Sequence, residues 1–138
     1  MKDGYDITEG VRGFRLRVWG RDERELFSRA LLGLAAVMRP DVAPSSGKAV
    51  RVRVHIRGDN WAETLLNFLR HAAFECEMQG AVFSAMDIIE LGPNEIECEL
   101  VGKTVERFEE EIDHIHCLSE GIRKTPERLE VELRAAVL

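Results

Sequence analysis

The residues with the widest chemical range stand close together in the last third of the chain: Asp113, His114, His116 and Cys117. On an extended chain alternate side chains point to the same side, so His114 and His116 would share one face. Such a pair could bridge a transition metal such as zinc if further donors arrived from elsewhere, with Glu9 as one candidate. A His-x-His pair is a weak signal, and two histidines with ordinary hydrogen bonds on a half-exposed strand are the simpler interpretation. A metal-dependent enzyme or regulator that uses Asp113, His114 and His116 is therefore the alternative hypothesis.

A second set of candidate residues is basic. Arginines alternate with apolar residues in two stretches, and we consider these as contacts for RNA or for an acidic partner: Arg12, Arg15, Arg17, Arg51, Arg53 and Arg57. Glutamates alternate in the same way in two other stretches, at Glu97, Glu99, Glu130 and Glu132. Opposite charges on neighbouring strands stabilise a sheet by roughly 0.2–1 kcal/mol per pair. The simpler interpretation is that basic strands lie beside acidic strands as ion-paired neighbours, since exposed ion pairs are common and weak.

Enzyme signatures are missing from the sequence. It contains no Walker loop, no dinucleotide-binding fingerprint, no Gly-x-Ser-x-Gly elbow and no paired-cysteine zinc signature. We therefore expect a protein that is not an enzyme and has no catalytic residues.

Composition limits the class of protein further. The 138 residues are most economically one domain, 1–138, and the net charge of −6 argues against a general nucleic-acid binder. That charge is unevenly spread, with 12 basic and 7 acidic groups in residues 1–58 and 7 basic and 18 acidic groups in residues 59–138. Three cysteines without Cys-x-x-Cys spacing favour reduced thiols and a cytoplasmic location. No apolar run approaches about 20 residues and no signal-peptide core is present, so we expect no membrane partner.

The element that organises the chain is a helix predicted from residue 61 to residue 79. Asn60 and Glu63 have the spacing of a capping box, and Gly80 suits the left-handed position just past a helix end. Between them, apolar residues recur at three- and four-residue spacing: Trp61, Leu65, Phe68, Leu69, Ala72, Ala73 and Cys76. This stripe predicts an amphipathic helix whose apolar face covers a sheet.

The other elements follow from the same periodicities. Alternation predicts strands over residues 14–18 and 50–57, and between them Asp22 caps a second amphipathic helix that Pro40 ends, followed by a loop over residues 41–48. After Gly80 we expect a strand over 81–91, a turn at 92–95, a return strand, an extended segment over 111–118 and a hairpin over 122–135. The predicted fold is α+β, a two-layer sandwich in which a mixed or antiparallel sheet has both amphipathic helices on one face.

The order and spacing of these elements resemble those of the archease family over most of the chain. The residues that carry the resemblance lie in the first strand and helix, in the second helix and the strand after it, and at the end of the fourth strand: Tyr5-Asp6, Leu16 to Gly20, Glu23 to Met38, Trp61 to Phe83 and Gly102 to Arg107. Archeases assist the tRNA-splicing ligase that joins RNA ends through a guanylylated intermediate. The resemblance therefore implies an archease-like fold and an accessory role in tRNA processing.

The chain departs from the family at its metal site. Archeases typically carry a His-Thr-Ala-Asp motif in the first strand, whose aspartate joins a second aspartate near the C-terminus. By spacing, this chain has Gly10-Val11-Arg12-Gly13 at the motif and ends on Ala136-Val137-Leu138, while the functional lysine of the family falls on Asp113. Calcium or another divalent metal is expected for the family, but glycine, valine and alanine supply no side-chain oxygens for such an ion. We expect no cofactor here, with Arg12 supplying the positive charge that a cation would give.

These observations give one leading hypothesis. We expect a non-enzymatic accessory protein, a diverged archease that has lost the usual metal site and acts by docking on a protein partner. The resemblance implies that this partner is an RNA ligase, so RNA would be met only indirectly. The divided charge favours steered docking on a complementary surface.

Overall fold

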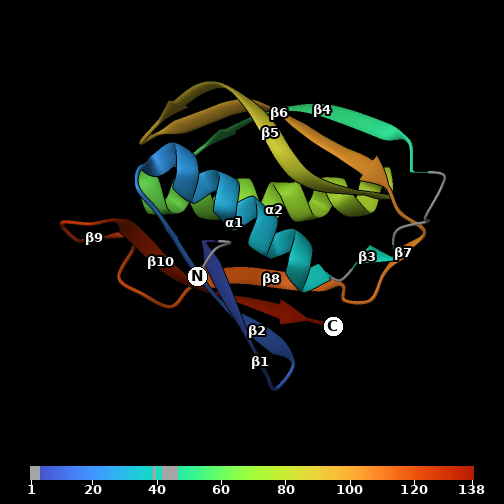
Figure 1. Ribbon diagram of the computed structural model, residues 1–138, viewed down its shortest axis with the longest axis horizontal. Coiled ribbons are helices and arrows are strands. Elements are labelled where there is room, and N and C mark those ends of the chain that lie inside the picture. The colour runs from blue at the N-terminus through green and yellow to red at the C-terminus, as the bar shows by residue number, and fades with distance from the viewer. Residues whose placement is uncertain (1–3, 39, 42–46) are drawn as a thin grey trace.

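The computed structural model describes residues 4–38, 40–41 and 47–138 as two helices between two antiparallel sheets (Figure 1). The first sheet has the order β1 (Tyr5–Gly10), β2 (Gly13–Gly20), β10 (Leu129–Val137), β8 (Ile112–Cys117), and β9 (Arg123–Lys124) also pairs with β10. The second sheet has the order β4 (Ala49–Arg57), β6 (Glu95–Thr104), β5 (Ala81–Gly92), and a small pair joins β3 (Pro40–Asp41) to β7 (Arg107–Phe108). Each helix, α1 (Glu23–Met38) and α2 (Trp61–Gln79), contacts both sheets.

The α+β class, the antiparallel strands and the two amphipathic helices are confirmed, but the layering differs from the expected two-layer sandwich. The strands form two sheets, and the helices fill the space between them. The reason lies in the small residues of α1. Gly33 and Ala35 are buried beside the apolar stripe, and a Cβ at Gly33 would lie only 2.7 Å from Leu16 Cδ1 of β2. The buried surface of α1 is thus wider than its apolar stripe, which lets the helix pack against both sheets.

The helix ends agree with the predictions. Asn60 Oδ1 accepts the Glu63 amide at 2.9 Å, and Gly80 follows α2 with φ 59° and ψ 44°. Asp22 Oδ1 accepts the Glu25 amide at 2.9 Å at the start of α1. These bonds use backbone groups that the first and last helical turns leave without partners. Within the described residues, neither helix is apolar over a length that would cross a bilayer.

The strands agree with the predictions except at the N-terminus and in the short β3–β7 pair, which was not predicted and includes Asp41 of the expected loop. The extended segment over 111–118 is β8, the last hairpin is β9 with β10, and Gly92 pairs with Glu95 around the predicted turn. The chain also forms a β1–β2 hairpin with Val11 and Arg12 at its turn, whereas the alternating pattern predicts no strand before residue 14. β1 lacks a clear alternating pattern because its last two residues are Glu9 and Gly10. Most of the loop expected over residues 41–48 lies outside the described residues.

Candidate functional site

Strand register gathers the basic residues of the first sheet on its outer face. Gly13 pairs with Ala136, which pairs with His114, and in the next row Arg15 pairs with Arg134, which pairs with His116. Directly paired residues point to the same side of an antiparallel sheet. The helices cover the opposite side, where Phe14, Ala135 and Ile115 are buried. Arginine and histidine side chains from three strands therefore share one solvent-facing surface.

A hollow of about 740 Å³ opens at the end of this surface, beside the β1–β2 turn. Its lining comes from the turn, from β8 and from the end of β10: Arg12, Asp113, His114, Arg134, Ala136, Val137 and Leu138. Two hydrogen bonds hold the turn against β10. Arg134 Nη2 donates to the Val11 carbonyl at 2.9 Å, and the Val137 amide donates to the Arg12 carbonyl at 3.0 Å.

Gly13 leaves room for the Arg134 guanidinium. A Cβ at position 13 would lie 3.0 Å from Arg134 Nη2 and 2.8 Å from the Ala135 carbonyl oxygen. Beside it, Arg12 has φ 55°, the left-handed region that costs an L-residue other than glycine roughly 1–2 kcal/mol. The turn thus keeps an arginine where a glycine would be less strained.

The metal site implied by the archease resemblance does not fit these residues. Gly13 and Ala136 are direct neighbours in the sheet and bring no side-chain oxygen, and a guanidinium occupies the space above Gly13. Asp113 is the one side-chain carboxylate among the residues that line the hollow. A hard divalent cation needs several oxygen donors, so this hollow is not built for calcium.

The alternative metal set is only partly brought together. The His114 and His116 rings stack with centroids 5.4 Å apart, and Asp113 Oδ2 lies 3.3 Å from His114 Nδ1. Glu9 is remote, because β2 and β10 separate its strand from β8, which makes three strand spacings or about 14 Å. In the described part of the chain, no group of three or more His, Cys, Asp or Glu side chains could hold a metal ion. The expectation that Glu9 approaches the histidines is therefore wrong.

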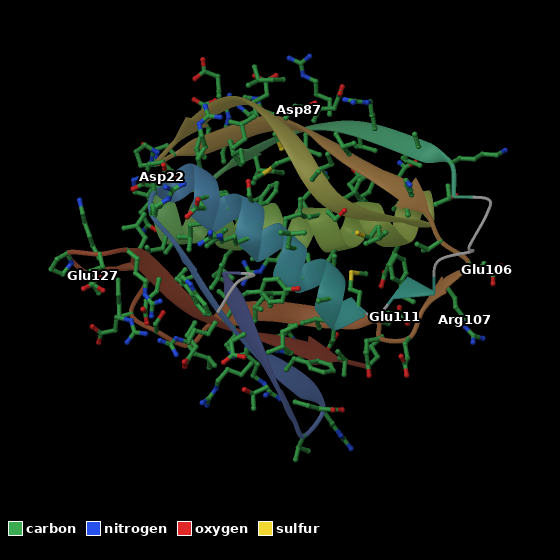
Figure 2. All side chains as sticks on the ribbon, viewed as in Figure 1. Asp22, Asp87, Glu106, Arg107, Glu111 and Glu127 are labelled. Carbon is green, nitrogen blue, oxygen red and sulfur yellow. The ribbon has the colours of Figure 1, made fainter. Side chains whose placement is uncertain are left out.

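Arg51 and Arg53 of β4 form ion pairs with the neighbouring strand β6, and Arg51 also reaches Asp87 of β5. Arg51 binds Glu99 and Asp87, Arg53 Nη2 lies 2.8 Å from Glu97 Oε2, and His55 Nε2 lies 2.7 Å from Glu95 Oε1. Asp87 stands on the outer side of this sheet (Figure 2). Hydrogen bonds to Glu99 and then Asp87 raise the pKa of the Arg51 guanidinium. Arg57 is the last residue of β4, is exposed, and pairs in register with Glu95 of β6.

These ion pairs follow a diagonal. Arg53 faces Glu99 in register but pairs with Glu97, which lies two residues earlier in β6. The first sheet repeats the offset, because Arg15 faces Arg134 but pairs with Glu132 at 4.0 Å, and Arg17 faces Glu132 but pairs with Glu130 at 3.6 Å. The ion-paired arrangement expected from the sequence is therefore present in both sheets.

The other end of the first sheet holds a charge cluster that sequence reasoning missed. Besides Arg17, Glu130 binds Arg123 at 3.0 Å and Arg128 at 2.9 Å, and the residue is only 8 % exposed. The guanidiniums of Arg17 and Arg128 lie 5.6 and 5.0 Å from the Trp19 ring centroid. The sequence shows the alternating glutamates Glu130 and Glu132, but it gives no sign that Arg123 and Arg128 bind Glu130.

An apolar patch lies on α2, next to β8. Phe74 and Met78 are four residues apart on α2, and 54 % and 65 % exposed. Phe74 also borders a small cleft of about 200 Å³ between α2 and β8, where Arg70 binds the Ile115 carbonyl through two nitrogens at 3.0 and 2.8 Å. Large exposed apolar side chains that adjoin one another mark surfaces suited to protein contacts.

The fold and this surface define an α+β protein with two helices between antiparallel sheets and a basic hollow at one sheet end. Residues 13–132 match the model of the Archease protein family (MTH1598/TM1083), and the chain belongs to this family. No curated protein is significantly similar to it.

Two solved structures share the fold. One is the solution structure of Methanobacterium thermoautotrophicum protein 1598, with 16% identity, 97% of this chain and 99% of that chain covered, and a TM-score of 0.66. The other is the crystal structure of an archease, a possible chaperone, from Thermotoga maritima, with 12% identity, 94% of each chain covered and a TM-score of 0.63. At these identities the likeness concerns the fold.

Proposed function

We propose that this chain is a non-enzymatic accessory protein that docks on an RNA ligase of the tRNA-splicing type and assists its reaction. The observation that carries the proposal is the family match over residues 13–132. The Thermotoga maritima relative, a possible chaperone, belongs to the same broad class of assisting proteins. RNA is met only through the ligase, and the free cysteines suit the reducing cytoplasm.

Two surfaces support a docking role. Phe74 and Met78 offer exposed apolar area on one side of α2, of the kind that anchors a protein interface. The guanidiniums of Arg12 and Arg134, at one end of the first sheet, offer positive charge that steers association with an acidic surface. The ligase would bury the apolar patch and meet the basic face at its rim.

Co-purification from a native lysate at low salt tests this proposal. We expect the wild-type protein to recover an RNA ligase, identified by mass spectrometry, and to increase RNA joining when the two purified proteins are mixed. The double variant Phe74→Asp with Met78→Asp should lose both effects. Leu32→Asp is the matched control, because Leu32 is an exposed apolar residue of the other helix, α1.

Recovery of the wild-type protein without any ligase, or unchanged joining in its presence, would contradict the proposal. Equal losses in the double variant and in the Leu32→Asp control would remove the role assigned to the apolar patch.

A further inference from the structure

The diagonal ion pairs of the first sheet stop one step before the hollow. Glu132 and Glu130 of β10 pair with Arg15 and Arg17 of β2. By the same offset, the partner of Arg134 would stand at position 13, which is a glycine. The Arg134 guanidinium instead lies over Gly13 and donates a hydrogen bond from Nη2 to the Val11 carbonyl. An arginine has five N–H donors, so most of those on Arg134 are left for another acceptor.

A second guanidinium borders the same hollow. Arg12 lines it from the turn, and among the described residues neither Arg12 nor Arg134 has an ion-pair partner. The acidic side chain of the hollow, Asp113, is next to the His114 ring. The side chains that line the hollow therefore include two guanidiniums and one carboxylate.

The turn holds Arg12 in place at a cost. Glycine at this position would remove the conformational strain of the left-handed backbone. Strained residues that persist in a fold point to a functional constraint. The Val11 and Arg12 carbonyls are both bonded to β10, so the two guanidiniums sit on one clamped unit. Groups positioned before a ligand arrives lose little freedom when it binds.

We propose that this hollow binds an oxyanion, a phosphate or a carboxylate group, between the guanidiniums of Arg12 and Arg134. Both anions match the planar donor fork of arginine. At about 740 Å³ the hollow has room for an anion that is one group of a larger molecule. This assignment rests on the geometry of the turn and does not depend on the proposed ligase partner.

Amide NMR titration of the whole protein with inorganic phosphate, a phosphomonoester and succinate tests the site. We expect saturable shifts confined to the amides of residues 11–13 and 134–137. Shifts with the two phosphate probes alone identify a phosphate site, and shifts with succinate alone identify a carboxylate site. The absence of saturable shifts with every probe at millimolar concentration would overturn the proposal.

Variants separate binding from folding. Arg12→Gly removes one guanidinium but relieves the left-handed strain, so affinity should fall about tenfold or more while thermal stability holds or rises. Arg134→Gln should weaken binding by a similar factor. Arg53→Gln is the matched control, because Arg53 is ion-paired on the second sheet, and its affinity should stay unchanged. Wild-type affinity in Arg12→Gly, or an equal loss in Arg53→Gln, would contradict the site.

Discussion

Glu130 and Glu132 are neighbouring outward-facing carboxylates of β10 with very different surroundings. Glu130 is 8 % exposed and holds three arginines, whereas Glu132 makes one pair at 4.0 Å. Removing a nearly buried carboxylate leaves its partners without an acceptor. We expect Glu130→Ala to lower the free energy of unfolding by about 1–3 kcal/mol, and Glu132→Ala by less than about 1 kcal/mol. Urea denaturation measures both, and equal losses would contradict this ranking.

The three thiols should differ sharply in reactivity. Burial raises the pKa of Cys76 to about 11 and that of Cys98 to about 12. Only the thiolate attacks a disulfide reagent, so at pH 8 both are protonated as well as covered. Half-buried Cys117 donates its Sγ hydrogen to the Ser119 carbonyl at 3.2 Å.

We therefore expect Ellman's reagent at pH 8 to titrate one thiol in the native protein and all three in denaturant. The variant Cys117→Ser should abolish the native reaction. Rapid reaction of a second thiol in that variant would mean that one side of the core opens readily.

At the scale of elements, α2 has recognisable capping residues at both ends, Asn60 and Gly80. Gly80 ends it at φ 59°, and no atom lies within 4 Å of the place where a Cβ would stand. The cost of Gly80→Ala is therefore conformational alone, about 1 kcal/mol. Gly92→Ala is the matched control, since Gly92 has the same open space without a positive φ and should change stability little. Thermal unfolding compares the two, and equal effects would contradict the capping role.

The predictability of the elements follows from where their signals lie. The caps of α2 and the alternation in β4 and β6 are local patterns, and each was confirmed. The division of the strands into two sheets has no local signal, because β2 pairs with β10 from the far end of the sequence. The burial of Gly33 and Ala35 was missed for a similar reason, since small residues leave hardly any trace in an apolar pattern.

The candidate site divides in the same way. Arg12 and Gly13 were singled out because the archease motif would lie there, whereas Arg134 was missed. In sequence, Arg134 is one more polar residue of an alternating strand that also carries Glu130 and Glu132. Only the register, which places it against Arg15 and beside Gly13, shows that its charge is not matched.

At the scale of the whole molecule, folding mixes the charges that the sequence keeps apart. The basic first half supplies β2 and β4, and the acidic second half supplies their neighbours β10 and β6. Arginines of the first half thereby form ion pairs with carboxylates of the second half across strand boundaries. The net charge still stays at −6, and at one end of the first sheet the guanidiniums of Arg12 and Arg134 have no ion-pair partner among the described residues.

The guanidiniums of Arg12 and Arg134 at this hollow predict the response to metals. A ligand that binds only the folded state stabilises it by about 2.7 kcal/mol at a hundredfold excess over its Kd. We expect neither calcium nor magnesium at millimolar concentration to raise the Tm above its value in a chelator. An upward shift of several degrees with calcium would mean that other oxygens, such as those of Asp6 or Glu9, form a site.

The pairing of β2 with β10 also dictates the order in which the molecule can assemble. The second sheet and α2 come from one continuous segment, residues 49–104, whereas the first sheet must close a loop over nearly the whole chain. Closing long loops is slow, so residues 49–104 should gain structure first. During synthesis on the ribosome, the edge of β2 that later pairs with β10 stays unpaired until β10 has been made. The charged side chains of Arg15 and Arg17 on this strand disfavour aggregation through that edge. Pulsed hydrogen exchange should accordingly protect the amides of β4, β5 and β6 before those of β2, and simultaneous protection would show that the chain closes in a single step.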